Sequence, residues 1–219
     1  MSMSHERLAL HAATSLAADV PGSAVPNGSM LDAACSLIAA RQNVSPKRLM
    51  EPGPSAEQLN CLLTAAAAAP DHGLLQPWRF MIIPQAKRSL LAEAFALALI
   101  DRDPGSTLEQ IEAAREKAHR SPLLMLAIVR LASEREPSIP DAERLVSLGG
   151  ALQNLQLAAH AMGFGSGLVS GQAMDSPRIR TLFRLEGSEQ AVCFVNVGTV
   201  EKRKPPRTRP VAAMIVSEL

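Results

Sequence analysis

The sequence predicts an α+β fold in which helices pack on a small sheet. Two observations support this class. Long segments whose apolar residues recur at steps of three and four alternate with a few short, continuous apolar runs. The helical segments outnumber these runs, so the sheet is expected to hold about four strands. A basic tail stiffened by proline follows the last run, "VEKRKPPRTRP".

The first 29 residues are predicted to form an N-terminal extension that is partly flexible. Residues 1–18 can form a loose helix, and "PGSAVPNGS" (residues 21–29) has the Pro, Gly and Ser content of a linker. Residues 30–219 are then expected to form one domain, because a chain of 219 residues with 47% hydrophobic residues can bury a sizeable core.

The first two helices of this domain are predicted from capping boxes. In such a box, the side chains of the first residue and of the residue three positions later cap each other's backbone N–H groups. Ser29 with Asp32 predicts a helix to about Arg41, and Ser55 with Gln58 predicts a second one. Leu59, Leu62, Leu63 and Ala66 give the second helix its apolar spacing, and Pro70 is expected to end it.

The remaining elements follow in order along the chain. Buried strands are predicted at residues 78–84, 123–131 and 190–199. Helices are predicted at residues 85–101, 107–119 and about 141–162, followed by a short helix with Ser176 as cap and Pro177 at its first position.

The glycine-rich segment "GFGSGLVSG" (Gly163–Gly171) is a weak dinucleotide signal. A dinucleotide-binding GxGxxG motif follows a strand and opens a helix. Here the glycines follow a long helix, are spaced as GxGxG and lead into a possible short strand. A helix C-cap at Gly163 followed by a turn is the better interpretation.

The composition excludes several classes of protein. With 22 basic and 21 acidic residues, and 3% aromatic residues, the chain offers no surface for nucleic acid or for an anionic membrane. No apolar run is long enough to span a bilayer, and the N-terminal segment is a poor signal peptide. Three cysteines without metal spacing (Cys35, Cys61 and Cys193) fit a reduced, cytoplasmic protein. Motifs for metal, P-loop or serine-hydrolase chemistry do not occur.

Three polar clusters lie on segments without regular structure: "ARQNVSPKRL" (Ala40–Leu49), the "PDHG" turn (Pro70–Gly73) and "PRTRP" (Pro206–Pro210). Each alone is typical of solvated surface. A single histidine such as His72 is more often a hydrogen-bonded turn residue than a ligand or a base. Function is therefore not predicted by any one cluster.

Taken together and in order, these segments resemble the nitroreductase family of FMN-dependent oxidoreductases. The resemblance covers the chain from about Met30 and is closest to a compact subgroup with a PDH turn. It depends on "RQN" with "SPKRL", on "APDHGLLQPWRF", on the long helix ending in "GFGSGLVSG", on the strand ending in "VGT", and on "PRTRP". It implies a nitroreductase-like fold: helices around a small mixed β-sheet with an extended C-terminal arm.

The resemblance also implies a site for FMN. The phosphate would need two or three cations, and arginine can bind its oxygens in pairs. Neutral groups would contact the ribityl hydroxyls or the ring edge, and a short segment would lie against the isoalloxazine. The expected cofactor-binding residues are Arg41, Gln42, Asn43, Lys47, His72, Gln76, Leu168, Val169, Ser170, Arg207 and Arg209. Trp78 is expected to be a core residue.

The implied activity is an FMN-dependent NAD(P)H oxidoreductase that reduces nitroaromatic or quinone acceptors by a ping-pong mechanism. NADH or NADPH would be the donor, the flavin would carry the chemistry, and no protein acid, base, nucleophile or metal is expected. A homodimer with FMN at the interface is also implied. Two alternatives stay open: a specialised flavin enzyme such as a dehydrogenase or dehalogenase, and a non-catalytic flavin-binding protein. Asn43 and Leu74 stand where the family has Ser and Asn.

Overall fold

The computed structural model describes residues 28–132, 139–202, 205 and 207–219. The chain divides into two units, residues 1–39 and 40–219. The helix predicted at residues 1–18 lies outside the described residues, as does the linker up to residue 27. Helix α2 (Gly28–Ala40) already starts at Gly28, so the predicted cap at Ser29 is wrong. Glycine is itself tolerated at a helix start, which leaves Ser29 inside the first turn.

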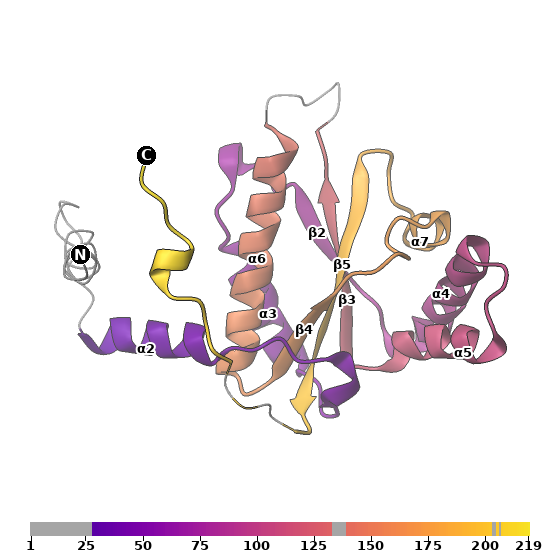
Figure 1. Cartoon of the computed structure of the whole chain (residues 1–219), viewed down its shortest axis with the longest axis horizontal. Helices are drawn as coiled ribbons and strands as arrows, with labels where there is room; N and C mark the ends of the chain where they lie inside the picture. Colours follow the sequence, from indigo (N-terminus) through magenta and orange to yellow (C-terminus); the bar gives the residue numbers. More distant parts are fainter. Residues whose placement is uncertain (1–27, 133–138, 203–204, 206) are drawn as a thin grey trace, which may run out of the picture. The chain divides into compact units, whose positions relative to one another are not determined.

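The second unit is built on a five-stranded sheet with the order β1-β5-β3-β2, in which β4 also pairs with β5 (Figure 1). The strands are β1 (Leu49–Met50), β2 (Trp78–Ile82), β3 (Leu123–Arg130), β4 (Gly165–Val169) and β5 (Glu189–Val200). The predicted α+β class is confirmed. Two-residue β1 was missed, because so short a strand has no recognisable periodicity.

All strand pairs of this sheet are antiparallel. Among the described residues, the one parallel pairing is a bridge between Asn43 and Ser166, outside the strands, so the sheet is antiparallel and not mixed as the resemblance implied. The connection from β2 to β3 explains the antiparallel pairing there. It holds two packed helices, α4 (Arg88–Arg102) and α5 (Leu108–Glu116), joined by a short loop. Such a helical hairpin returns the chain to the end of the sheet that it left.

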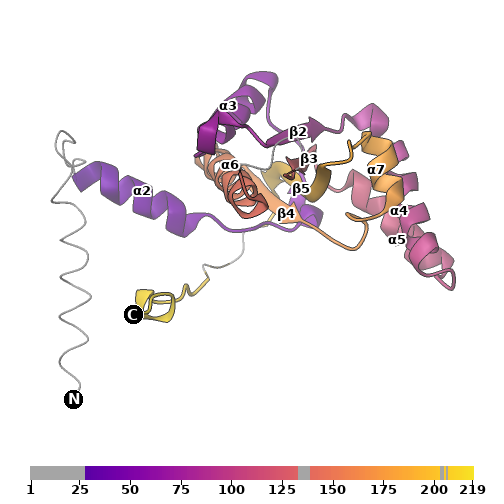
Figure 2. The same ribbon diagram turned by 90° about the horizontal axis from the view of Figure 1, so that it is seen from above.

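Helices cover both faces of the sheet (Figure 2). Helices α3 (Ala56–Ala67) and α6 (Asp141–Ala161) lie on one face, and α4 and α7 (Pro177–Phe183) lie on the other, where α5 packs on α4. Successive side chains of a strand point to opposite faces. Strand β3 therefore sends Met125, Ala127 and Val129 into the core under α6, and Leu124, Leu126 and Ile128 into the core under α4. A strand covered on both faces reads as a continuous apolar run, as predicted.

The predicted helix ends are largely confirmed. Ser55 and Gln58 form the expected capping box at the start of α3, and Ser176 caps α7 with Pro177 at its first position. Helix α3 ends at Ala67, three residues before Pro70, because the residue preceding a proline is disfavoured in the helical conformation. Gly163 follows α6 with φ of +87°, the left-handed conformation expected of a C-cap glycine.

A buried arginine joins three elements at one end of the sheet. Arg88 is 1% exposed and donates hydrogen bonds to the carbonyl oxygens of Ile83 (2.8 Å), Ala118 (2.7 Å) and Pro122 (3.1 Å). Ile83 directly follows β2, and Ala118 and Pro122 precede β3, so Arg88 links the segments on either side of α4 and α5. Burial lowers the pKa of the Arg88 guanidinium.

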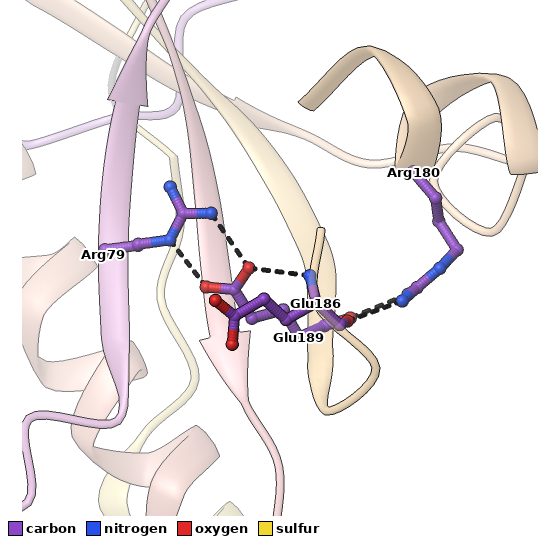
Figure 3. A network of polar contacts seen from close by, with 4 residues as sticks. All are labelled: Arg79, Arg180, Glu186 and Glu189. Atoms are coloured by element: carbon purple, nitrogen blue, oxygen red, sulfur yellow. Dashed lines mark hydrogen bonds and ion pairs between the residues drawn. The ribbon is translucent and has the colours of Figure 1, made fainter. Parts of the chain in front are cut away.

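A second polar network closes the opposite end of the sheet (Figure 3). Arg79 on β2 reaches across β3 and binds both carboxylate oxygens of Glu189, at 2.6 and 2.9 Å. The backbone N–H of Glu186 donates to the same carboxylate at 3.2 Å. Arg180 on α7 donates to the carbonyl oxygens of Glu186 and Glu189, both at 2.7 Å. The turn that leads into β5 is thus attached to both β2 and α7.

Within the described ranges, no helix combines the length and the apolar character needed to cross a membrane.

Candidate functional site

A small polar cavity opens at the start of β4, between the loop after α2 and the end of β5. Its volume is about 70 Å³. Basic and amide side chains dominate the polar part of the lining, and apolar residues close its floor. The lining residues are Ala40, Arg41, Gln42, Asn43, Val44, Arg48, His160, Phe164, Gly165, Ser166, Val200 and Lys202. No acidic residue is among them, so the cavity attracts anions.

The C-terminal tail folds back onto this loop. The guanidinium of Arg209 donates from Nη2 to the carbonyl oxygen of Arg41 at 2.7 Å, and the Gln42 amide donates to the carbonyl oxygen of Pro205 at 3.2 Å. Residues from opposite ends of the domain therefore meet, as the sequence predicted. Burial lowers the pKa of Arg41, and the positive charge of Arg209 lowers it further. A bound anion would relieve this repulsion.

Two arginines that line the cavity each have a side-chain nitrogen without a hydrogen-bond partner among the described residues. These nitrogens are Nε of Arg41 and Nη1 of Arg48, both buried. Buried polar groups are almost always paired, so two unpaired donors beside one cavity indicate a missing acceptor. Lys47, which is expected from the sequence to contact the cofactor, is not among the residues that line this cavity, whereas its neighbour Arg48 is. The 3₁₀ turn Pro46–Arg48 places the two on different sides, and only Arg48 lines the cavity.

Glycines on β4 allow the loop to lie directly on the strand. A Cβ at Gly167 would collide with the carbonyl oxygen of Val44, and one at Gly165 would lie 3.1 Å from the Val44 side chain. The loop is held there by a bond from the Val44 N–H to the Ser166 carbonyl (2.8 Å). The Asn43 side chain also accepts from the N–H of Leu168 at 2.9 Å. The glycines of β4 thus allow the arginine loop to pack closely on the strand.

The PDH turn lies elsewhere. It is a tight turn in which Gly73, Leu74 and Gln76 have φ of 67°, 56° and 43°. Positive φ is uncommon for residues with a side chain and often marks functional segments. The Asp71 carboxylate accepts from the Gln76 N–H at 2.6 Å, and His72 pairs with Glu143 at 2.7 Å. His72 and Gln76 keep exposed side chains.

The turn and the cavity lie at opposite ends of α6. His72 contacts Glu143 in the first turn of the helix, whereas His160 in its last turn lines the cavity. These two helix residues are 17 positions apart, which is ~25 Å at a rise of about 1.5 Å per residue. Figure 1 shows α6 running from the start of β2 to the start of β4. Within one chain, the structure does not bring the two predicted parts of the site together.

A comparison with known families identifies the chain. The model of the Nitroreductase family matches residues 40–199, which is more than half of its length and includes the arginine loop, the PDH turn and all five strands except the end of β5. The chain belongs to the nitroreductase family. This is a family of oxidoreductases.

Relatives within the nitroreductase family support the assignment. Over 169 residues the chain is 35% identical to YdjA of Escherichia coli and 32% identical to a protein of Haemophilus influenzae, both provisionally named NAD(P)H nitroreductases. Each alignment covers 76% of this chain, with 87% of YdjA and 88% of the Haemophilus protein.

Solved structures show the same fold. The nitroreductase-like family protein from Bacillus cereus has a TM-score of 0.72 at 17% identity, covering 84% of this chain and 95% of that one. NfrA1 of Bacillus megaterium has a TM-score of 0.66 at 14% identity, covering 85% of this chain and 74% of that one. At these identities the likeness concerns the fold alone.

The other predicted residues of this nitroreductase-family chain fall outside the cavity. Leu168 packs partly on the core, while Val169 and Ser170 follow at the exposed end of β4. Arg207 is exposed on the tail. Trp78 packs on the core as predicted, and its indole N–H donates to Ser147 of α6 at 2.9 Å.

Proposed function

We propose that the protein is an FMN-dependent NAD(P)H oxidoreductase that reduces nitroaromatic or quinone acceptors by a ping-pong mechanism. The observation that carries the proposal is the pair of unpaired buried guanidinium nitrogens, on Arg41 and Arg48, beside a cavity with no acidic lining. A chain of this family with such a site has the donors that a flavin phosphate needs.

The residues present fit the phosphate end of FMN. Arginine binds phosphate oxygens in pairs, and Arg41, Arg48 and Lys202 bring three positive charges to one cavity. The cavity of about 70 Å³ is far below the roughly 300–1,000 Å³ of pockets that enclose whole small molecules. Only the phosphate would therefore be enclosed there. Leu168 and Val169, at the end of β4, would then contact the ring system.

When bound, FMN would supply the hydride and electron transfer between NAD(P)H and the acceptor. The protein residues hold and orient the cofactor. The loop that carries Arg41 and Arg48 is fixed to β4 through Asn43 and Val44, so its cations keep a defined position relative to the strand. Such preorganisation lowers the cost of ordering side chains on binding. No side chain is assigned the role of acid or base.

A homodimer with the cofactor between the two copies accounts for the separated parts of the site. An extended FMN spans roughly 15–18 Å at bond lengths near 1.5 Å, which is less than the ~25 Å along α6 between Glu143, which contacts the PDH turn, and His160, which lines the cavity. One flavin cannot contact both in a single chain. In a twofold dimer, the turn of the partner can approach the cavity of the first copy, and the reverse contact follows by symmetry.

The first test compares the affinity of the protein for FMN with its affinity for riboflavin. Arg41→Ala and Arg209→Ala should each weaken FMN binding about tenfold or more, because each removes a charged contact worth about 1.5–3 kcal/mol. Riboflavin lacks the phosphate, so its affinity should hardly change. Lys87→Ala, an exposed lysine outside the cavity, is the control. Equal losses for FMN and riboflavin would contradict the phosphate assignment. Anaerobic bleaching of the bound flavin by NADH or NADPH then tests the redox function.

A further inference from the structure

A histidine lies among the cations of the small polar cavity. His160 stands in the last turn of α6 and lines the cavity together with Arg41, Arg48 and Lys202. Its side chain is partly buried. Histidine is the side chain whose charge ordinarily changes between pH 5 and 8. The charge of His160 can therefore respond to the charge of a ligand in this cavity.

The charged groups that share the cavity with His160 come from two of the surrounding segments. Arg41 and Arg48 belong to the loop after α2, and Lys202 follows β5. The part of β4 that lines the cavity is uncharged, and no acidic residue of the described chain is in the lining. Without an anion, these three positive charges oppose a fourth positive charge on the imidazole.

The position of His160 on α6 acts in the opposite direction. The carbonyl oxygens of a helix point toward its C-terminus and give that end a partial negative charge, which favours a cation in the last turn. His160 is the basic residue of this turn. The helix end thus favours a charged imidazole, whereas the three cations disfavour it. A change in the charge of the cavity therefore alters the protonation of His160.

A bound phosphate would make this change. A phosphate monoester carries a charge of about −1.5 to −2 at neutral pH. Among the three cations, each with a charge of +1, it would lower the sum of the charges that share the cavity with His160 from +3 to about +1. The repulsion that opposes the imidazolium falls accordingly. An imidazolium also donates from both ring nitrogens, and phosphate oxygens are strong acceptors. Protonated histidine and bound phosphate therefore stabilise each other.

We propose that His160 is a further binding group of this cavity and takes up a proton when phosphate binds. This inference rests on the proposed function, in which the phosphate is that of FMN. The proton comes from solvent or, near pH 6, where a phosphate monoester loses its second proton, from the phosphate hydroxyl. No bond other than those to this proton forms or breaks. The contribution of His160 to FMN affinity is fully present at the acidic end of the histidine range and is lost as the pH rises through it.

The test compares FMN and riboflavin binding by the full-length wild type and by His160→Gln across the histidine range. Titration of the phosphate itself affects both proteins alike, so the ratio of their FMN affinities isolates His160. This ratio should be near one at about pH 8.5 and rise to about tenfold in favour of the wild type at about pH 6. Riboflavin affinities should be equal at every pH. His119→Gln, at an exposed histidine outside the cavity, is the matched control.

Proton uptake is measured directly by calorimetry of FMN binding in buffers of different ionisation enthalpy. The wild type should take up more protons than His160→Gln and than His160→Lys, whose fixed cation needs none; the lysine variant serves if His160→Gln folds poorly. Equal proton uptake, or an affinity ratio that stays constant with pH, would overturn this inference and leave the flavin assignment standing. If the wild type bound no FMN at any pH, the proposed function and this inference would both be wrong.

Discussion

At the scale of single residues, two adjacent cations differ in whether they line the cavity. Lys47 and Arg48 have similar charge and stand next to each other in the 3₁₀ turn Pro46–Arg48. Lys47 points to solvent, whereas Arg48 has a buried nitrogen without a partner in the described part of the chain. A run of two cations carries no sequence signal that distinguishes them. The difference comes from the backbone of the turn.

The two variants should therefore behave differently. Arg48→Gln is expected to weaken FMN binding about tenfold or more, because it removes a charged donor from the anion cavity. Lys47→Gln should change FMN affinity by less than about twofold, since a solvated cation contributes little. Flavin fluorescence quenching in a titration measures both. Similar losses in the two variants would show that the effect is a general change of surface charge.

At the scale of elements, the sequence predicts most helices and strands but not how they are joined. Continuous apolar runs gave β2, β3 and β5, because both faces of the sheet are covered and burial leaves a clear pattern. The sequence does not indicate that Arg88 and Glu189 are buried, although each connects several elements. A charged residue in an amphipathic segment is predicted to have an exposed side chain. Its burial depends on carbonyl or guanidinium partners far along the chain.

Glu189 makes one such connection testable by pH. The hydrogen bonds from Arg79, followed by the bond from the Glu186 N–H and the charge of Arg79, hold the pKa of Glu189 below its ordinary 4.5. Its contribution to stability is thus fully present above pH 4.5 and is lost as the pH falls through the lowered pKa. Glu189→Gln should cost about 1–3 kcal/mol at pH 7, toward the lower end because Arg79 is 41% exposed.

Urea denaturation of wild type and variant at decreasing pH measures this effect. The difference in unfolding free energy should shrink once the pH falls below 4.5. Glu93→Gln is the control, since Glu93 is 52% exposed in its pair with Arg115 and should matter little at any pH. A pH-independent difference would mean that packing, and not the charge of Glu189, stabilises the turn.

The loop on β4 gives a second prediction at this scale. Gly167→Ala should displace the loop that carries Arg41 and Arg48, because the new methyl group would occupy the place of the Val44 carbonyl. We expect about 1–3 kcal/mol lower stability and at least tenfold weaker FMN binding. Gly171→Ala is the matched control, since a Cβ there meets nothing within 4 Å. Thermal unfolding measures the stability of both variants, and flavin titration measures their FMN affinity. An unchanged FMN affinity in Gly167→Ala would separate the loop from the site.

At the scale of the whole molecule, the arrangement of the candidate site could be predicted only in part. The resemblance grouped Arg41 and Arg209 from distant positions, and the two residues are joined by a hydrogen bond in the structure. It also grouped His72 and Gln76 with them, although the structure places these at the other end of α6. Order along a chain does not indicate which residues meet within one copy and which meet between two. The length of α6 shows that the two groups of residues are far apart within one copy.

A complementation experiment tests the proposed dimer through this separation. One variant carries Arg41→Ala and Arg209→Ala, and the other carries His72→Ala and Gln76→Ala; each alone should bind FMN weakly. If each flavin site takes its cavity from one copy and its turn from the other, a mixed dimer has one site with all four changes and one site with none. Random mixing yields about half mixed dimers, so roughly a quarter of the wild-type FMN capacity should return. Flavin retained after desalting of the co-refolded mixture measures this capacity. No recovery in demonstrably mixed dimers would mean that the turn does not complete the site of its partner.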